Sequence, residues 1–371
     1  MAQKVLITGG AGFIGRFVAA QLLERGDDVR VLDSLIPQVH GDGLAPGVLP
    51  AEVDLMTGDV RDIDAVRRAL KGIDKVVHLA AEVGVGQSMY AIDRYTSVND
   101  LGTATLFQAL IDDPVARVVV ASSMSIYGEG LYKDSEGTTH EDVLRRPRGP
   151  NDASWDPLDA AGLPMEPIPT PETKRPTLAS VYAITKFVQE RLTLTVAPAY
   201  GMEGVALRLW NAYGPGQALS NPYTGVLAIF ASRIANGVAP VIFEDGQQRR
   251  DFVHVKDVAR AFLLALDHPK AAGGVFNIGS GEDRSVNDVA TLLADAMGRA
   301  DIRPEIAGKA RAGDIRHCIP DIDKAVEQLG FEPIEDFRDG LTELAEWVSR
   351  QEATDRVGEA RQELEARGLV A

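Results

Sequence analysis

The stretch Lys4-Val5-Leu6-Ile7-Thr8-Gly9-Gly10-Ala11-Gly12-Phe13-Ile14-Gly15 decides the fold of this 371-residue chain. Its first five residues are a β-branched, mostly apolar run, which predicts a buried strand of a parallel sheet. Glycines at positions 9, 12 and 15 permit a tight turn, and helical apolar spacing follows from Arg16 to Arg25. A pyrophosphate can approach such a backbone closely, and the helix N-terminus attracts its charge. This interpretation predicts a dinucleotide site that includes Gly9, Gly12, Phe13, Ile14 and Gly15.

A glycine-rich turn with a purely structural role would show the same spacing. A second feature of the sequence is therefore needed to distinguish such a turn from a dinucleotide site. Asp33 ends the next apolar strand, 29–33, at the distance expected for an acid that binds a ribose. Its carboxylate can accept hydrogen bonds from the adenosine ribose and would repel a 2′-phosphate. We therefore expect the cofactor to be NAD and not NADP.

Strand and helix signals alternate through the first half of the chain, a pattern typical of a doubly wound parallel sheet. Further strands are expected up to Met56 and over 75–81, 117–121 and 205–209, with helices over 98–110 and 180–196. Helices and short strands mix after residue 220. The predicted fold class is α/β, a Rossmann-type doubly wound sheet with a smaller C-terminal α+β substrate lobe.

The same pattern suggests the domain boundaries. Residues 1–210 are expected to form the cofactor-binding domain, and 211–350 a substrate-binding lobe partly interleaved with it. Residues 351–371 are charged and lack a strong apolar face, so we expect a solvated helix or a frayed tail. Residues 129–179 interrupt the alternation with many Pro, Gly, Asp and Glu residues. An insertion this long is usually a functional lid or else disordered.

Several residues follow predicted strands, where ligands of such sheets bind. Asp59 could hydrogen-bond an adenine amine, although capping of the helix that starts near Asp62 is an equal alternative. His78 is expected in the wall of the cofactor pocket as a neutral, packed side chain and not as a proton carrier. The remaining expected cofactor contacts here are Val60, Leu79, Ala80 and Ala81.

Composition excludes several functional classes. The 54 acidic residues outnumber the 38 Lys and Arg, and the net charge of −16 disfavours nucleic acid or an anionic membrane as a partner. The single cysteine, Cys318, excludes an internal disulfide framework and a zinc site built from cysteines, and we expect no metal. No apolar run reaches about 18 residues and no secretory signal precedes the first strand, so a cytoplasmic protein is expected.

Tyr182 and Lys186 form the most informative pair in the sequence. The i to i+4 spacing places the phenol and the ammonium on one face of a helix. A nearby cation favours the ionised phenol, so we expect the pKa of Tyr182 to be lowered from about 10. Such a tyrosine can take a proton from a sugar hydroxyl near neutral pH.

Ser122-Ser123-Met124-Ser125-Ile126-Tyr127-Gly128 follows the strand 117–121 and completes a Ser/Tyr/Lys set in chain order. With the glycine turn, 78–81, Tyr182 with Lys186, and the run 208–216, the chain resembles the extended short-chain dehydrogenase/reductase family of nucleoside-diphosphate-sugar epimerases and dehydratases. The resemblance covers Val5 to about Trp347.

The resemblance implies residue roles. Lys186 would hold the nicotinamide ribose and keep Tyr182 acidic, and Ser123 would bond the substrate hydroxyl and relay its proton. Asn99 resembles the structural asparagine that the family has near its active site, and we expect it among the residues that bind the cofactor. The residues matched to the sugar nucleotide are Ser123, Ser125, Asn211, Arg250, Arg311 and Asp314.

Met124 and Ser125 narrow the reaction. Dehydratases of this family have Asp-Glu at these positions, whereas methionine cannot protonate a leaving hydroxyl and serine is a poor base. We therefore predict a 4-epimerase that uses a transient 4-keto sugar. The segment 216–225 and the insertion resemble the dTDP-L-rhamnose 4-epimerase subgroup, with UDP-galactose or UDP-uronate 4-epimerases as the alternative. A one-way reductase, a dehydratase and a non-catalytic NAD-binding protein are less favoured hypotheses.

Two further expectations concern surfaces. The helices over 98–110 and 180–196 carry more apolar residues than one buried face needs, and in the resembled family such helices pair across a two-fold axis. We expect a homodimer. The insertion connects the strand that leads to Ser123 to the helix of Tyr182, so we expect it to fold over the sugar end of the substrate.

Overall fold

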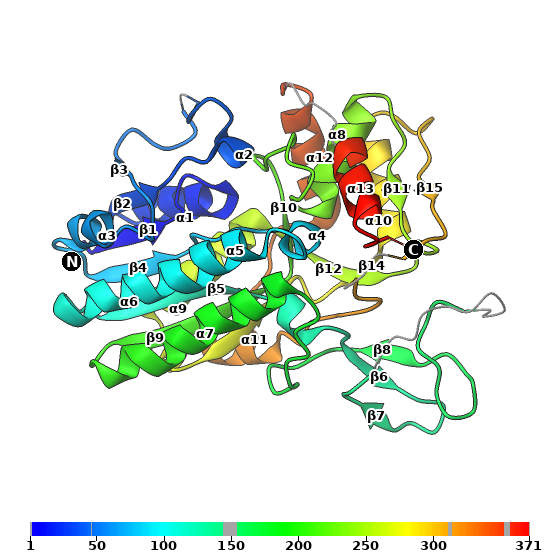
Figure 1. Cartoon of the computed structure of the whole chain (residues 1–371), viewed down its shortest axis with the longest axis horizontal. Helices are drawn as coiled ribbons and strands as arrows, with labels where there is room; N and C mark the ends of the chain where they lie inside the picture. Colours follow the sequence, from blue (N-terminus) through cyan, green and yellow to red (C-terminus); the bar gives the residue numbers. More distant parts are fainter. Residues whose placement is uncertain (1, 46, 144–153, 311–313, 352–356, 371) are drawn as a thin grey trace.

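The computed structural model describes residues 2–45, 47–143, 154–310, 314–351 and 357–370. Its centre is a seven-stranded parallel sheet in the order β13-β9-β5-β4-β1-β2-β3 (Figure 1). The chain order reverses between β1 and β4, and ligands of such sheets bind at this point, at the carboxyl ends of the strands. The strands are β1 (Lys4–Thr8), β2 (Asp28–Asp33), β3 (Asp54–Thr57), β4 (Lys75–His78), β5 (Arg117–Ser123), β9 (Glu203–Leu209) and β13 (Val275–Ile278).

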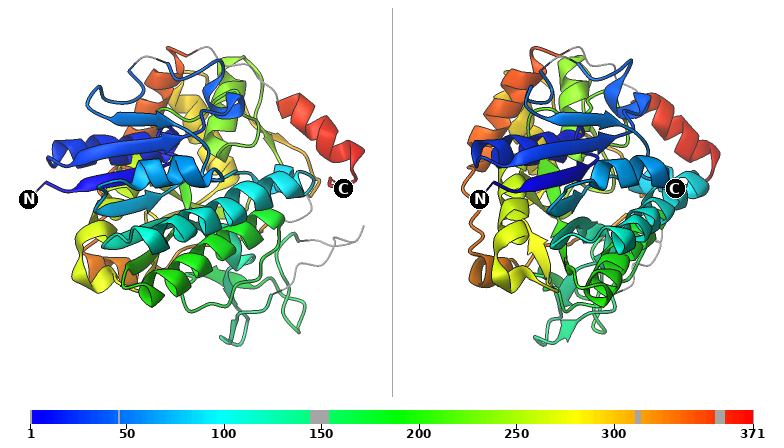
Figure 2. Two further views of the ribbon diagram at one scale, coloured as in Figure 1. Left: turned by 60° about the vertical axis from the view of Figure 1, so that its left-hand side comes forward. Right: turned by 90° about the vertical axis from the view of Figure 1, so that its left-hand side faces the viewer.

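Helices cover both faces of the seven-stranded sheet, so this part of the structure has three layers (Figure 2). The strands are buried on both sides, which explains their continuous apolar runs. One layer contains α1 (Phe13–Glu24), α9 (Val255–Asp267) and α11 (Asp323–Leu329). The other contains α3 (Ile63–Leu70), α6 (Gly102–Asp112) and α7 (Val181–Ala199).

The helix expected over 98–110 differs in detail. A short helix, α5 (Ile92–Tyr95), comes first, and a π-helical turn, η1 (Thr96–Leu101), joins it to α6. The wider turn contains Asn99, whose buried amide bonds the backbone of Glu82 in both directions. Turns of this kind are frequent at functional sites.

A smaller lobe follows, with its own apolar core. Its three-stranded sheet consists of β10 (Asn211–Tyr213), β12 (Arg249–His254) and β14 (Asp283–Ser285). Its second sheet pairs β11 (Val241–Ile242) with β15 (Glu305–Ile306), and its main helices are α8 (Val226–Ala235), α10 (Val286–Ala296) and α12 (Phe337–Val348). However, α9, β13 and α11 return to the large sheet, so residue 210 does not separate two independent chain segments.

The insertion contains regular structure, although it is rich in proline and glycine. Three short antiparallel strands, β6 (Leu131–Lys133), β7 (Thr139–His140) and β8 (Glu166–Ile168), form a small sheet at the lower right of Figure 1. Backbone N–H groups of Gly130 and Thr170 donate to the carbonyls of His317 and Ile319 at 2.8 Å. Tertiary hydrogen bonds of this kind compensate for weak local strand preference.

Four of the remaining short elements lie around the pocket: α2 (Pro37–His40), α4 (Val85–Ser88), η2 (Met124–Tyr127) and α13 (Val357–Ala366). The short helix η3 (Pro269–Ala271) follows α9 and packs against α11. Among the described residues, no helix combines the length and apolar character needed to span a bilayer.

Candidate active site

A pocket of about 1420 Å³ lies between the carboxyl ends of the large sheet and the smaller lobe. Its lining includes the glycine turn, the end of β2, the segment after β4 and the turn after β5, together with residues of β10, α8 and β12. The position is the one predicted from the alternating pattern of strands and helices. The volume is large enough for two bound molecules of nucleotide size.

The glycine turn is shaped for close contact with a ligand. Gly9 has φ +71°, and a Cβ added there would lie 2.7 Å from the backbone nitrogen of Ala80. A Cβ on Gly15 would lie 2.5 Å from the Cα of Gly10. Gly12 caps α1 without a side-chain hydrogen bond, so the first N–H groups of the helix face the pocket uncovered. Phe13 and Ile14 also line the pocket, and this arrangement suits the pyrophosphate of a dinucleotide.

Asp33 ends β2 at the same pocket. Its two carboxylate oxygens accept the backbone N–H groups of Ala11 at 3.0 Å and Leu35 at 2.9 Å. These bonds fix the carboxylate beside the glycine turn, and each oxygen keeps a free lone pair for a ribose hydroxyl. The geometry supports the predicted ribose contact.

Asp33→Ser should weaken NAD binding by about tenfold or more, the scale of a lost charge-assisted hydrogen bond. It should also reduce the ratio of the affinity for NAD to the affinity for NADP, because the carboxylate no longer repels the 2′-phosphate of NADP. Titration of both dinucleotides checks this. The control is Asp28→Ser, since Asp28 is exposed at the opposite end of the same strand. An unchanged ratio of the two affinities would remove Asp33 from the ribose site.

Asp59 is placed by the structure in the pocket lining, together with Val60. The helix cap is Asp62, which accepts the N–H groups of Asp64 and Ala65, so Asp59 does not fill that alternative role. Arg61 binds both oxygens of Asp59, at 2.9 and 2.6 Å, and this bonding lowers the pKa of the carboxyl. Asp59 is thus a fixed carboxylate at the pocket, and the adenine contact stays a proposal.

Leu79, Ala80 and Ala81 line the pocket, but His78 does not, which corrects the expected wall position. His78 is buried one layer behind, where its ring nitrogens bond the hydroxyls of Thr8 at 2.7 Å and Thr103 at 2.8 Å. Burial lowers the pKa of His78 to about 3, so the ring is neutral.

Asn99 also lies behind the pocket lining and not in it, so the structure shows no direct cofactor contact for it. Its side-chain amide donates to the hydroxyl of Thr185 at 2.9 Å. Because its other bonds hold the backbone of Glu82, Asn99 connects the segment after β4 to the helix that carries Tyr182 and Lys186.

The start of α7 is fixed from three sides. Ser180 caps the helix by accepting the N–H of Ala183, and the hydroxyl of Ser88 accepts the N–H of Tyr182 at 3.0 Å. The Tyr182 ring packs edge-on against Tyr95, with centroids 6.4 Å apart. Helix α7 therefore holds the phenol in one place at the pocket.

Ser123, Tyr182 and Lys186 all line the pocket, as predicted. The expected electrostatics are wrong, however. Burial raises the pKa of Tyr182 to about 12, and the influence of Ser123, which lowers it, only partly offsets this. Lys186 does not compensate, because burial lowers its own pKa to about 7 and its ammonium donates to Gln189 Oε1 at 2.7 Å. Ionisation of the phenol therefore needs further positive charge in the pocket.

A buried ion pair supports the serine turn from below. The Arg208 guanidinium lies 2.7 Å from Glu190 Oε1, and the Ser122 hydroxyl donates to Glu190 Oε2 at 2.6 Å. Arg208 also donates to the Tyr127 hydroxyl at 2.7 Å. The network joins β5, α7 and β9 directly behind Ser123.

The predicted substrate residues are brought together only in part. Ser125, Asn211, Arg250 and Asp314 line the pocket, whereas Arg311 lies outside the described residues. The Asn211 amide donates to the carbonyl of Asp251 at 2.9 Å, and Arg250 donates to carbonyls of the 315–316 segment. The buried hydroxyl of Ser125 has no hydrogen-bond partner among the described residues, as expected of a group that awaits a ligand.

Sequence reasoning missed Arg16. This residue follows the glycine turn, lines the pocket and donates to the carbonyl of Gly216 in the smaller lobe. Burial lowers the pKa of its guanidinium, and its Nε has no described partner. Its position directly after Gly15 was the available signal, because it places a cation at the anion-binding end of α1.

Two predictions about the periphery need correction. None of the described residues of the insertion lines the pocket, so 129–143 and 154–179 do not form the expected lid. By contrast, residues of 357–370, expected to be solvated, do line it. Arg316 explains the first result: this fully buried guanidinium binds Asp156 at 2.6 Å together with Glu244 and Asp245, and so holds the insertion against the outside of the lobe.

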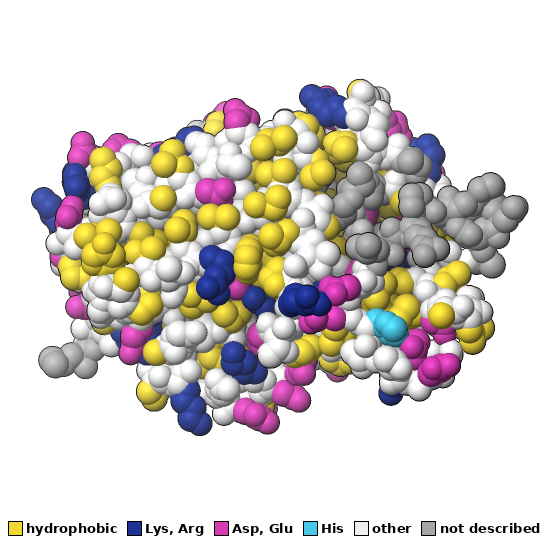
Figure 3. Space-filling model, turned by 60° about the horizontal axis from the view of Figure 1, so that its bottom comes forward, with side chains coloured by type: hydrophobic (Ala, Val, Ile, Leu, Met, Phe, Trp, Pro, Cys, Tyr) yellow, Lys and Arg dark blue, Asp and Glu magenta, His cyan; other side chains and the backbone are white. Residues whose placement is uncertain are grey.

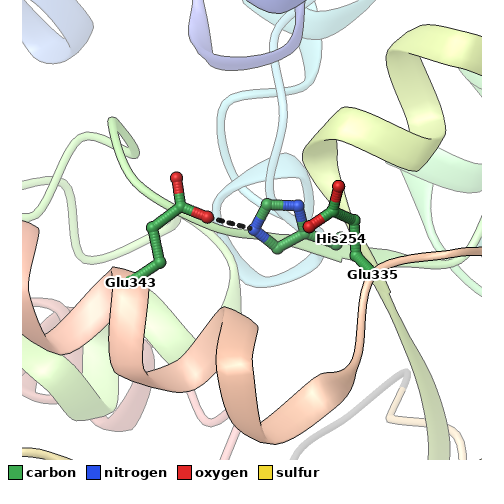
Figure 4. A group of neighbouring side chains, drawn as sticks. All are labelled: His254, Glu335 and Glu343. Atoms are coloured by element: carbon green, nitrogen blue, oxygen red, sulfur yellow. Dashed lines mark ion pairs between the residues drawn. The ribbon is translucent and has the colours of Figure 1, made fainter.

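Outside the pocket, His254, Glu335 and Glu343 form a group with the spacing of metal ligands (Figure 4). Glu343 lies 3.5 Å from Nε2 of His254. The Lys256 ammonium is 2.8 Å from Glu343 and 4.0 Å from Glu335, so a cation of the chain already neutralises the carboxylates. The group is therefore better explained as an ion-pair cluster between α9 and α12.

The sheet, the glycine turn, Asp33 and the Ser/Tyr/Lys set together define a Rossmann-type oxidoreductase or isomerase site of the short-chain dehydrogenase/reductase kind. Residues 5–154 and 161–279 match the NAD-dependent epimerase/dehydratase family. The chain belongs to this family, and its cofactor is NAD.

Individual relatives agree. The chain is 36% identical to dTDP-L-rhamnose 4-epimerase of Burkholderia thailandensis over 94% of this chain and 96% of that protein. It is 31% identical to UDP-glucose 4-epimerase of Halalkalibacterium halodurans, covering 89% and 91%. Among solved structures, UDP-glucose 4-epimerase of Thermotoga maritima with UDP-glucose has a TM-score of 0.75 at 31% identity, covering 94% and 99%. The UDP-glucose 4-epimerase of Thermus thermophilus in complex with NAD has a TM-score of 0.74 at 30% identity, covering 94% and 100%.

Proposed function

We propose that the protein is a 4-epimerase of a nucleoside-diphosphate hexose. The observation that carries the proposal is that Ser123 and Tyr182 line the same cofactor pocket and that Met124 and Ser125 directly follow Ser123 there. The pair can move the proton of a sugar hydroxyl, and the two following side chains cannot supply the acid and base that dehydration needs.

The residues perform their steps in order. When bound, NAD supplies a hydride acceptor and, in its oxidised form, the positive charge that favours the Tyr182 phenolate. Tyr182 then takes the proton of the C4 hydroxyl, directly or through Ser123, as the sugar is oxidised to a ketone. Once the keto sugar had rotated in the pocket, Tyr182 would return the proton to the C4 oxygen, which completes the inversion at C4. Lys186 lines the same pocket and would donate to the ribose of the bound cofactor.

The best candidate pair of substrates is dTDP-L-rhamnose and dTDP-6-deoxy-L-talose. The 36% identity to dTDP-L-rhamnose 4-epimerase extends over nearly the whole chain and supports this choice. UDP-galactose or UDP-uronate epimerisation is the second candidate, supported by the relatives and structures that act on UDP-sugars.

The test is turnover of a panel of dTDP- and UDP-sugars, with product stereochemistry read by NMR. We expect interconversion of dTDP-L-rhamnose and its C4 epimer without net consumption of NAD. Denaturing the purified protein should release NAD in near-stoichiometric amount. Dependence on added NADPH would indicate a reductase, and binding without turnover of any sugar nucleotide would contradict the proposal.

An exposed apolar surface suggests how the protein assembles. Val83, Ile92, Leu101 and Ile184 are 43–55% exposed and lie on or near α5, η1 and the first turn of α7. Figure 3 shows hydrophobic side chains gathered on the face that includes α6 and α7. A second copy placed about a two-fold axis could cover this surface, because the same helices then meet their own counterparts.

We therefore expect a homodimer by light scattering at micromolar concentration. Leu101→Glu should produce monomers, because it places a charge in the apolar contact. Val326→Glu is the control, since Val326 is 44% exposed but lies on α11 in the opposite helix layer. A wild-type monomer, or equal dissociation of both variants, would refute this assembly.

A further inference from the structure

The C-terminal segment forms part of the pocket wall. Helix α13 lies in front of the smaller lobe, near α4 (Figure 1), and its residues line the pocket. The segment 357–370 contributes apolar side chains to the lining, and Leu364 is only 7% exposed although the helix lies at the surface. These apolar lining residues are Val357, Ala360, Leu364, Leu369 and Val370.

Two contacts hold the segment in this position. A Cβ added to Gly86 would lie 3.5 Å from Cδ1 of Leu364, so this leucine packs directly on α4. The Arg367 guanidinium stacks over the Tyr90 ring at 4.5 Å. The Tyr90 hydroxyl in turn bonds the Tyr223 hydroxyl at 2.6 Å. The segment 357–370 is therefore attached directly to Gly86 and Tyr90 and, through Tyr90, to Tyr223.

Both attachment points belong to the catalytic end of the pocket. Ser88, the last residue of α4, accepts the N–H of Tyr182 at 3.0 Å. Gly84 and Tyr223 are in close contact, since a Cβ on Gly84 would lie 2.9 Å from the Tyr223 Cβ. Only the four-residue helix α4 lies between Leu364 and the start of α7. We therefore place Leu364 at the end of the pocket that would hold the sugar, and not at the end formed by the glycine turn.

We propose that residues 357–370 complete the sugar end of the substrate site and that Leu364 is a specificity-determining residue there. This rests on the proposed function. Apart from Arg361, whose guanidinium donates to Glu365 at 2.9 Å, the side chains of this wall are aliphatic. Aliphatic side chains cannot pair with a sugar hydroxyl, and a hydroxyl buried without a partner is penalised. The segment therefore favours a 6-deoxyhexose, whose methyl group needs no partner, over a hexose with a C6 hydroxyl.

The first experiment compares kcat/KM for dTDP-L-rhamnose with that for UDP-glucose and dTDP-glucose. Leu364→Ala should lower the ratio of 6-deoxy to C6-hydroxylated substrate by about tenfold, because the removed methyl groups no longer contact the sugar. Its NAD content should not change. The matched control is Gln362→Ala, because Gln362 lies on the exposed side of the same helix. Equal ratios in the two variants would overturn the proposal.

A second measurement is independent of turnover. Hydrogen exchange of residues 357–370 in the wild-type holoenzyme is followed with dTDP alone, UDP alone, dTDP-L-rhamnose and UDP-glucose. We expect a sugar nucleotide to slow exchange of this segment several-fold more than its nucleotide alone. If exchange is the same in all four cases, the segment does not contact the sugar, whether or not the enzyme proves to be an epimerase. Conversely, protection of the segment by a sugar nucleotide that the enzyme does not turn over would reject the proposed function. It would still support the inference that residues 357–370 contact the sugar.

Discussion

Tyr182→Phe should lower the rate of epimerisation by about 10²-fold or more, the usual contribution of a positioned acid–base group. The substitution removes the ionisable oxygen and keeps the ring, which packs edge-on against Tyr95. Folding and NAD binding should therefore persist. Turnover and the released dinucleotide are measured on the same preparation.

Tyr200→Phe is the matched control, because Tyr200 is 48% exposed immediately after the same helix α7. It should have wild-type activity. Near wild-type turnover of Tyr182→Phe would remove the phenol from the mechanism. The Ser123 hydroxyl would then be the remaining candidate proton carrier of the Ser/Tyr/Lys set at the pocket.

Glu190→Ala should destabilise the protein by about 3–5 kcal/mol, the usual cost of leaving a buried charge without its partner. Arg208 and Glu190 have side chains only 6% and 1% exposed, and Ser122 would lose its acceptor as well. Urea unfolding, followed by fluorescence, measures the change. The turn that carries Ser123 lies directly above this network, so activity should fall too.

The control is Asp112→Ala, which breaks the ion pair between Asp112 and Arg67. The side chain of Arg67 is 51% exposed and that of Asp112 is 59% exposed. Exposed pairs contribute at most about 1 kcal/mol, because water screens both charges and side-chain entropy opposes the contact. If the two substitutions shift the unfolding midpoint equally, burial does not decide the strength of the Arg208–Glu190 pair.

The local features of the site could be predicted because short-range rules govern them. The glycine turn and Asp33 depend on the spacing of residues within one strand–helix–strand unit, and the pair Tyr182–Lys186 depends on the spacing within one helix. The pKa of Tyr182 could not be read in this way. The burial of the Tyr182 ring depends on every element that packs around it. This burial raises the pKa of Tyr182 although Lys186 lies four residues away on the same helix.

The periphery was predicted less well, for a related reason. The charged tail looked solvated because only a few of its residues are apolar, yet Leu364 is buried by Gly86, which is distant in the chain. Likewise, the insertion looked like a lid, and the buried Arg316 holds it elsewhere. Neither contact has a signal in the local spacing of residues.

The sequence by itself determined the class of fold, the cofactor and the set of side chains that can move a proton, because these follow from periodicity, turn chemistry and residue type. Only the tertiary structure decided which of these groups meet, how far burial shifts their pKa values, and that residues 357–370 line the pocket. The physical reason is that burial and long-range contacts depend on packing between elements that lie far apart in the chain.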